Sequence, residues 1–451
     1  MVQIPIKIYV QNLAKKAQEA ARPFALVANG KRTEVLFEMA EQLGTRTEEI
    51  LEANSKDLEA IPKDLGAEAY RQALDRAKIT EEQVHEIGEG IQAIAEQPDS
   101  IGEVTHVWNT DDGMQVRRVR VPLGVIAVIS EFGPLVTAES IAMCLKTGNV
   151  CIFRGGRELF YTNMAVIGVL RETATKGGIP EAAITFLDRP DPEGALELVR
   201  LPKYVNAIIP RGKGGLRKAV MEQARMPVLG YDGGPCHVYI DGDVELPLAQ
   251  SIVVNSKIQD PLASNAADTI LVHQAASRQL LPGLLRRLLE EFKVDLCGCP
   301  KTISLMGVME MTGHKGIKNA SEEDWGQKYQ SLTLAIKIVK DMDEGIAHIA
   351  KYGPGHTDAI VTRDYATAMR FVREVDSSAV MVNASTRLHG GPPFGLGSEI
   401  GMNTTHFHAR GPLTLQALTV EKYVAFGSGH LRQPHPVPQA YEDAMMMSVK
   451  F

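Results

Sequence analysis

The chain has 451 residues, of which 44% are hydrophobic and 23% are charged, and its formal net charge is -7. This length allows two or three domains with a sizeable core, and the composition excludes a disordered or fibrous protein. The negative charge gives nucleic acid no basic surface to bind, and the sequence shows neither a membrane-length apolar stretch nor a signal peptide. We expect a globular, cytoplasmic protein that binds neither nucleic acid nor a membrane.

The first hundred residues predict several amphipathic helices, because apolar residues recur three and four positions apart, as at Val10, Leu13 and Ala17. An Asp-Gly turn at residues 112–113 precedes alternation of apolar and polar residues over residues 114–121, a pattern that predicts a β-hairpin.

After residue 124, β-branched runs alternate with helical segments, which predicts a parallel sheet covered on both faces. The expected strands are residues 125–129, 150–153, 183–187 and 205–209, with helices from about Thr137 and Tyr161. A second α/β segment spans about residues 247–383, with expected strands at 269–272, 332–338, 358–361 and 379–382. The tail after Tyr423 is rich in proline and methionine, and both a loosely held terminus and a partner-binding extension remain open.

The cysteines and histidines predict no metal site. Five cysteines fit free thiols in a reducing compartment, so disulfides are not expected. Cys297 and Cys299 form a lone Cys-x-Cys pair, which we expect in a surface loop. His406 and His408 show no ligand spacing and are expected to be surface or core residues.

Residues 255–265 read Asn-Ser-Lys-Ile-Gln-Asp-Pro-Leu-Ala-Ser-Asn. This segment resembles the nucleophile loop of the γ-glutamyl phosphate reductases (glutamate-5-semialdehyde dehydrogenases), a branch of the aldehyde dehydrogenase superfamily, which reads Asn-Ala-Lys-Thr-Gln-Arg-Pro-Gly-Val-Cys-Asn. The likeness runs from about residue 8 to about residue 427. Its further markers, in the family's order, include residues 118–125, 144–149, 154–156, 209–214, 236–241, 323–326, 355–361, 383–387, 394–401 and 408–412.

The resemblance implies an aldehyde dehydrogenase-like α/β fold, with two doubly wound domains and a β-hairpin oligomerisation element. It implies an NADP-binding Rossmann-like domain at residues 1–245, which includes the hairpin at 105–122, and a catalytic-type α/β domain at 246–404. An oligomerisation segment at 405–428 and the Pro/Met-rich tail at 429–451 follow. A homodimer or larger homo-oligomer is expected, and a further protein partner is left open.

In that family NADPH delivers hydride to a cysteine thioester made from γ-glutamyl phosphate, and glutamate semialdehyde for proline synthesis is released. The cysteine corresponds here to Ser264, which precedes Asn265. A hydroxyl needs an adjacent general base to act as a nucleophile, and the sequence shows none around Ser264. We therefore expect no thioester at this position.

Three further site changes accompany Ser264. Leu135 stands where the family has an asparagine that is expected to donate to the oxyanion, a contact typically worth about 2.7–4 kcal/mol. Gly133 and Asp260 replace arginines, which suit phosphate and carboxylate groups. Pro393 replaces a polar residue that holds the nicotinamide ribose in the superfamily. Together the four changes indicate natural divergence from the reaction.

Other positions keep features that suit a nucleotide phosphate, namely cations and glycine turns with exposed backbone N–H groups. These candidate cofactor-binding residues are Lys146, Arg154, Gly155, Gly156, Pro210, Arg211, Gly212 and Gly214. The same glycines are expected if strand-to-helix turns alone require them, so NADP(H) binding and a purely structural role both remain open. Asp232 is expected to be a solvated turn residue rather than a general base.

Three hypotheses follow. The favoured one is a catalytically silent family member that acts by binding or assembly. The second is an active NADP-dependent oxidoreductase, on the same or an altered substrate, for which Cys236 is the nearest alternative nucleophile. The third is an assembly protein built on the hairpin and on residues 406–426.

Overall fold

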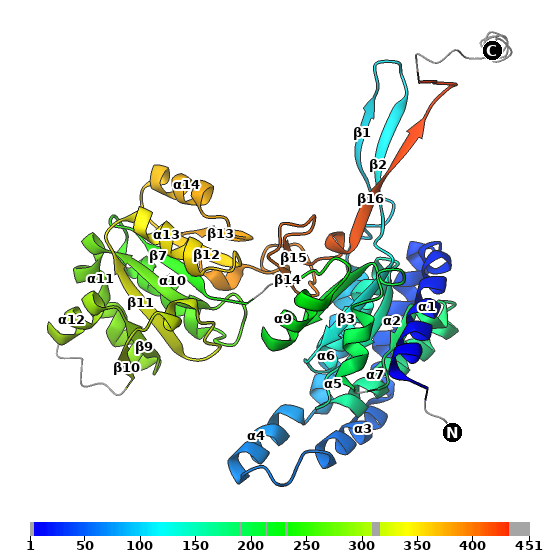
Figure 1. Cartoon of the computed structure of the whole chain (residues 1–451), viewed down its shortest axis with the longest axis horizontal. Helices are drawn as coiled ribbons and strands as arrows, with labels where there is room; N and C mark the ends of the chain where they lie inside the picture. The colour runs from blue at the N-terminus through cyan, green and yellow to red at the C-terminus, as the bar shows by residue number, and fades with distance from the viewer. Residues whose placement is uncertain (1–3, 190, 213, 231–232, 309–315, 433–451) are drawn as a thin grey trace.

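The computed structural model describes residues 4–189, 191–212, 214–230, 233–308 and 316–432. Two α/β lobes lie along its longest axis, and a three-stranded arm extends from the first lobe (Figure 1). Within these ranges no helix is both long and apolar enough to cross a membrane.

Five amphipathic helices open the first lobe, as the spacing of apolar residues predicts. They are α1 (Ile6–Ala25), α2 (Asn29–Thr45), α3 (Thr47–Glu59), α4 (Ala67–Ala77) and α5 (Glu81–Glu96). Val10, Ala14 and Ala17 are fully buried along one face of α1. Thr80 and Gln83 form a capping box that fixes the start of α5.

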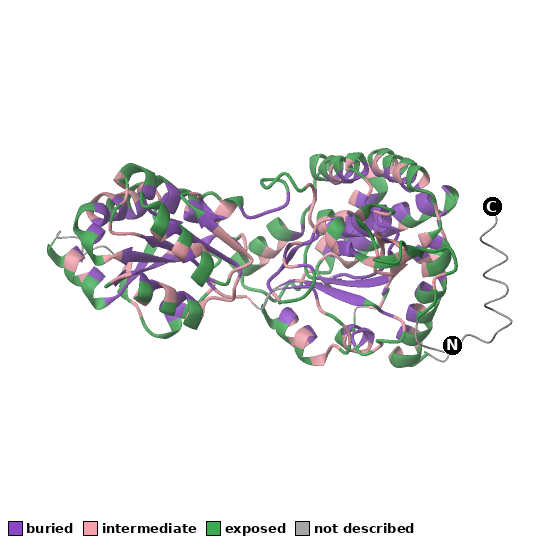
Figure 2. Ribbon diagram, turned by 90° about the horizontal axis from the view of Figure 1, so that it is seen from above, coloured by how far each residue is buried: buried purple, intermediate pink, exposed green. Residues whose placement is uncertain are grey.

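The first sheet is parallel and has the strand order β5-β4-β3-β6. Its strands are β3 (Val125–Ser130), β4 (Val150–Arg154), β5 (Ile184–Phe186) and β6 (Ala207–Arg211). The helices around it are α6 (Pro134–Lys146), α7 (Phe160–Lys176), η1 (Glu181–Ala183), α8 (Pro192–Leu198) and α9 (Gly214–Gln223). Every residue of β3 and β4 is buried, and Figure 2 shows the buried strands between helices that are exposed on part of their surface.

Two details of the first sheet shape the candidate site. The α6 helix begins at Pro134, three residues before the predicted start, because proline suits the first turn of a helix. The strands β3, β4 and β5 follow one another toward one edge of the sheet, and β6 pairs with the opposite side of β3. The crevice at the carboxyl ends of β3 and β6 is therefore the topological switch point, where open α/β sheets bind ligands.

The second sheet is parallel with the order β10-β9-β11-β8-β7-β12-β13. Its strands are β7 (Cys236–Ile240), β8 (Ala267–His273), β9 (Asp295–Gly298), β10 (Ile317–Asn319), β11 (Thr333–Val339), β12 (Thr357–Val361) and β13 (Ala379–Val382). The helices are α10 (Leu246–Ile258), α11 (Gln274–Arg286), η2 (Arg287–Glu291), α12 (Pro300–Val308), η3 (Glu323–Gly326), α13 (Met342–Tyr352), α14 (Tyr365–Glu374) and η4 (Thr386–Leu388).

The structure differs from the sequence expectations at two places in this lobe. The β7 strand lies between β8 and β12, so residues 236–240 belong to the second sheet although they precede the predicted boundary at 245. Cys297 ends up in β9 and is 1% exposed, and Cys299 is 6% exposed, so the prediction of a surface loop is wrong. The Cys297 thiol is buried within β9, whereas Cys299 follows the strand and its sulfur accepts from the Ile338 N–H at 3.5 Å.

The arm is an antiparallel sheet of β1 (Val104–Asn109), β2 (Gln115–Pro122) and β16 (Thr419–Phe426). The predicted hairpin is confirmed, and the C-terminal strand lies beside it. Trp108 meets Tyr423 edge to face at 6.1 Å between ring centroids. Short elements β14 (Met402–Asn403), β15 (Gly411–Pro412) and η5 (Gln416–Leu418) lead to β16, and tail residues 433–451 lie outside the described residues.

Candidate functional site

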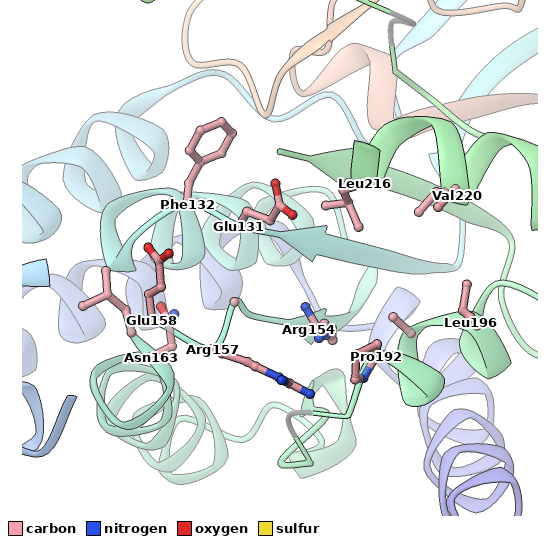
Figure 3. Close-up of a pocket in the computed structure, with 14 residues that line it drawn as sticks. Glu131, Phe132, Arg154, Arg157, Glu158, Asn163, Pro192, Leu196, Leu216 and Val220 are labelled. Atoms are coloured by element: carbon pink, nitrogen blue, oxygen red, sulfur yellow. The ribbon is translucent and has the colours of Figure 1, made fainter. Parts of the chain in front are cut away.

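A cavity of about 600 Å³ lies at the carboxyl ends of β3 and β4 and against the helices that follow β5 and β6 (Figure 3). We call it the switch-point cavity. Its lining residues come from segments that follow each of the four strands. They are Glu131, Phe132, Arg154, Gly156, Arg157, Glu158, Leu159, Asn163, Pro192, Ala195, Leu196, Leu216, Ala219 and Val220.

Two arginines give this cavity a cationic wall. Arg154 ends β4, and Arg157 follows it after the glycine turn; Figure 3 shows both side chains at the cavity. Burial lowers the pKa of Arg154, the charge of Arg157 lowers it further, and Glu131 opposes the shift. The two guanidinium groups are thus close enough to repel each other, an arrangement that a bound anion would stabilise.

The candidate glycines divide into two groups. A Cβ at Gly212 would lie 2.5 Å from Glu131 Oε2, and a Cβ at Gly155 would lie 3.1 Å from Asn163 Nδ2, so in both places a neighbouring side chain would have to shift. A Cβ at Gly156 would meet Glu131 Cα at an ordinary 3.5 Å, and one at Gly214 would meet nothing closer than 3.9 Å. Packing therefore does not explain Gly156 and Gly214.

Lys146 faces away from the cavity. Its ammonium is buried and donates hydrogen bonds to Thr33 Oγ1 at 2.9 Å and to the Ala95 carbonyl oxygen at 2.7 Å. These bonds tie the end of α6 to α2 and α5. The placement supports a structural role, and cofactor contact by Lys146 stays a prediction without support from the geometry.

The end of β6 holds the two remaining candidates. Pro210 packs against Gly230, whose Cβ would lie 3.1 Å from the proline ring. The Arg211 guanidinium lies 5.5 Å from the centre of the Phe132 ring. Burial raises the pKa of Glu399, and the nearby charge of Arg211 is one of the effects that oppose this shift. Asp232 lies outside the described residues.

Ser264 lies in the loop between α10 and β8, in the second lobe. Its side chain is half-buried, and no side chain of the described ranges is hydrogen-bonded to its hydroxyl. Its neighbour Asn265 is 8% exposed, donates from Nδ2 to the His389 carbonyl oxygen at 2.8 Å and accepts from Arg387 Nη1. Among the described residues, therefore, the geometry gives Ser264 no hydrogen-bonded general base, and it gives Asn265 a role in holding the loop.

Cys236 lies directly beneath this loop. Its Sγ is 3.3 Å from the Ser264 carbonyl oxygen and 3.9 Å from His356 Nδ1. Burial raises the pKa of this thiol to about 12, although the charge of Lys328 opposes the shift. A thiol so far from ionisation is a poor nucleophile at neutral pH, so this arrangement does not supply a replacement for the missing cysteine.

A buried charge cluster supports the loop, and the sequence analysis missed it. Asp268 Oδ2 accepts from Lys328 Nζ at 2.6 Å and from the Cys236 backbone N–H at 3.2 Å. Lys257 Nζ lies 3.7 Å from Asp268 Oδ1, and burial lowers the pKa of Lys257 to about 8. The sequence signal for this cluster was Lys257, which lies near the end of α10 on a mainly apolar face.

The other predicted site positions lie in different parts of the chain. Gly133 and Leu135 lie at the start of α6 in the first lobe, where both line a pocket of about 210 Å³. Pro393 is exposed in a turn after η4. Asp260 does lie in the Ser264 loop, where its Oδ2 is 3.6 Å from Arg387 Nη2.

The histidine and cysteine positions show no metal site. His406 is exposed and lies 3.2 Å from Asp376, His408 is exposed, and all five cysteines are buried free thiols. No group of three or more His, Cys, Asp or Glu residues within the described part of the chain could hold a metal ion.

Comparison with known proteins identifies the family. The family model described as "Aldehyde dehydrogenase family" matches residues 7–295. The γ-glutamyl phosphate reductase of Thermodesulfovibrio yellowstonii is 41% identical over 95% of this chain and 100% of its own length. The chain belongs to the γ-glutamyl phosphate reductase family. The γ-glutamyl phosphate reductase of Moorella thermoacetica is 42% identical over 95% of this chain and 100% of its own length.

Solved structures agree with this family assignment. The crystal structure of γ-glutamyl phosphate reductase from Thermotoga maritima has a TM-score of 0.89 and 36% identity, and covers 94% of this chain and 100% of that one. An acetylating aldehyde dehydrogenase from Geobacillus thermoglucosidasius, at 16% identity and a TM-score of 0.65, shares the fold, covering 95% of this chain and 98% of its own. The predicted aldehyde dehydrogenase-like α/β fold is confirmed.

Proposed function

We propose that this γ-glutamyl phosphate reductase family member binds NADP(H) in the switch-point cavity. The observation that carries the proposal is the pair Arg154 and Arg157 on the wall of a 600 Å³ cavity at the carboxyl ends of a parallel sheet. Guanidinium groups bind phosphates through parallel N–H donors, so the pair suits a nucleotide that carries several phosphates.

Reductase activity is the function that the comparisons support best. The relatives named γ-glutamyl phosphate reductase match over their whole length at about 40% identity. Nothing in these comparisons indicates that the activity has been lost. On this ground the first candidate is NADPH-dependent reduction of γ-glutamyl phosphate to glutamate semialdehyde.

The residues around Ser264 favour a second candidate, a protein that binds the nucleotide without forming a thioester. Ser264 has no hydrogen-bonded base within the described residues, and burial raises the pKa of Cys236 to about 12. Neither side chain offers an ionised nucleophile at neutral pH. Binding or assembly would then be the function of this chain.

An activity assay separates the two candidates. The full-length protein is mixed with NADP+, phosphate and glutamate semialdehyde, and NADPH formation is followed by absorbance. Turnover at roughly 1 per second or faster, the lower end of typical enzymes, establishes the first candidate and contradicts the second. NADPH binding without detectable turnover establishes the second, and absence of NADPH binding contradicts the proposal as a whole.

A further inference from the structure

The guanidinium of Arg387 is enclosed by the Ser264 loop, which we define as residues 259–266. Arg387 Nε donates to Gln259 Oε1 at 2.8 Å, and Nη1 donates to Asn265 Oδ1. Nη2 lies 3.6 Å from Asp260 Oδ2. All three guanidinium nitrogens therefore face side chains of one loop.

The backbone around Arg387 is fixed independently of these contacts. Ser385 Oγ caps η4 by accepting from the Arg387 N–H at 3.2 Å, and it lies 3.1 Å from Ser256 Oγ on α10. Ser256 Oγ also accepts from the Thr386 N–H at 3.2 Å. Since α10 holds η4 in place, Arg387 would keep its position if Asp260 were changed.

The Nη2 edge of Arg387 is neutralised but not tightly bonded. A separation of 3.6 Å is an ion pair rather than a hydrogen bond. The Arg387 side chain is 17% exposed and that of Asp260 is 46% exposed, so the contact lies at the mouth of the loop. Asp260 Oδ1 accepts from the Leu262 N–H at 3.1 Å, which holds the carboxylate there.

We propose that Arg387 is an anion-binding residue of the Ser264 loop, for a carboxylate or phosphate group, and that Asp260 occupies its Nη2 edge as an internal competitor. A free guanidinium edge binds such groups through two parallel N–H bonds, and the Asp260 carboxylate both covers that edge and repels an incoming anion. The inference rests on the proposed function in taking the Ser264 loop as the site of the acyl substrate. It names the ligand class of that site and explains why an anion would bind there weakly.

Neutralising Asp260 tests the inference. Asp260→Asn keeps an oxygen that can accept from the Leu262 N–H but removes the charge. Full-length protein is titrated with inorganic phosphate, and separately with L-glutamate, at constant ionic strength, and the dissociation constant is taken from the rise in Tm with ligand. We expect Asp260→Asn to bind one or both anions at least about threefold more tightly than the unmodified chain, as a partly exposed ion pair allows.

A matched control and a second variant make the result specific. Asp243→Asn removes the same charge from an exposed ion pair with Arg363, 3.9 Å apart in the same lobe, and should bind like the unmodified chain. Adding Arg387→Gln to Asp260→Asn should abolish the gain. Should that double variant fail to fold, Arg387→Lys takes its place, because lysine keeps the charge without the bidentate geometry, and should lose most of the gain.

The outcomes separate the ligand chemistries. If affinity rises for phosphate alone, the Nη2 edge of Arg387 binds a phosphate group. If it rises for glutamate alone, this edge binds a carboxylate. An unchanged affinity for both anions in Asp260→Asn overturns the inference, as does a gain that survives the change at Arg387. NADPH titration of the same samples reports on the proposed function separately, since the switch-point cavity lies in the other lobe.

Discussion

We expect the chemistry of this chain to depend on Ser264, because its motif corresponds to the family's cysteine. Ser264 lies in a loop held by Asn265 and by the buried pair of Lys328 and Asp268. Among the described residues, these contacts hold the loop in place and no side chain is hydrogen-bonded to the Ser264 hydroxyl as a base. Restoring a sulfur therefore tests whether the rest of the site still works.

Ser264→Cys should bring little or no turnover. We expect Leu135 to supply no oxyanion donor and Asp260 to repel the anionic substrate, so the variant should remain at least about a hundredfold below a typical family rate, because one lost oxyanion donor alone costs about 10²–10³ in rate. The NADPH absorbance assay measures this, with Ser251→Cys on the exposed side of α10 as the matched control. Full activity on cysteine replacement would show that the other changes do not matter.

His389 gives a prediction for the effect of pH on stability. Burial lowers its pKa to about 4, while the unfolded chain has the ordinary value of about 6.5. Between these values the unfolded state binds more protons, so stability is full above pH 6.5 and falls as the pH drops toward 4. From pH 7 to pH 5 this one group should cost roughly 2 kcal/mol.

The variant His389→Asn should lose that part of the pH dependence. The asparagine side chain can still form a hydrogen bond with Thr357 Oγ1, which lies 2.7 Å from His389 Nδ1. Unlike histidine, asparagine does not titrate. Urea unfolding at pH 7 and pH 5 provides the measurement. His85→Asn, on the exposed face of α5, is the control, and equal pH dependence in all three proteins would contradict the assignment.

At the scale of elements, α6 joins the sheet to the helical layer. It begins at Pro134 beside the switch-point crevice and ends at Lys146, whose ammonium bonds to residues of α2 and α5. The end of this helix is therefore a structural junction. The start of the helix, with Gly133 and Leu135, lines the pocket of about 210 Å³.

Lys146→Met should lower stability without weakening nucleotide binding. The change leaves the buried Ala95 carbonyl oxygen without its partner, which costs about 1–3 kcal/mol. Thermal unfolding and NADPH titration measure the two effects separately, and Lys176→Met, at an exposed ion pair, is the control. A loss of NADPH affinity at unchanged stability would instead indicate that Lys146 contributes to cofactor binding.

The sequence predicted the elements whose pattern is local and missed those that depend on distant partners. Runs of β-branched residues located β3, β4 and β8 within one or two residues. The short β9 and β10 were missed because their strand character comes from pairing with each other and with β11. The loop positions Ser264 and Asn265 were visible as a motif, whereas the contacts of Arg387 and Lys328 join residues more than 50 positions apart and leave no local pattern.

In the molecule as a whole, the arm carries several exposed apolar side chains. Val107, Trp108, Tyr423 and Phe426 are 55%, 40%, 67% and 53% exposed on β1 and β16. Apolar side chains gathered on a projecting sheet with two open edges are typical of subunit contacts. This supports the expected homo-oligomer, which remains a proposal.

Tyr423→Glu should shift the protein toward monomer at micromolar concentration. The new carboxylate must be desolvated in an apolar contact, and Arg118, which lies opposite position 423, is already paired with Glu421, so the oligomer should dissociate at least tenfold more readily. Light scattering coupled to gel filtration measures the mass. Leu26→Glu, at an 81% exposed leucine at the end of α1, is the control, and a monomeric unmodified chain would remove the basis for the prediction.

Calorimetric titration with NADPH is the sharpest test of NADP(H) binding in the switch-point cavity. We expect saturable binding of one NADPH per chain. Arg157→Ala, which removes a charge-assisted phosphate contact, should weaken binding at least about tenfold, and Arg171→Ala on the exposed surface of α7 should leave it unchanged. Absence of NADPH binding, or binding that Arg157→Ala leaves unaltered, would contradict NADP(H) binding in this cavity.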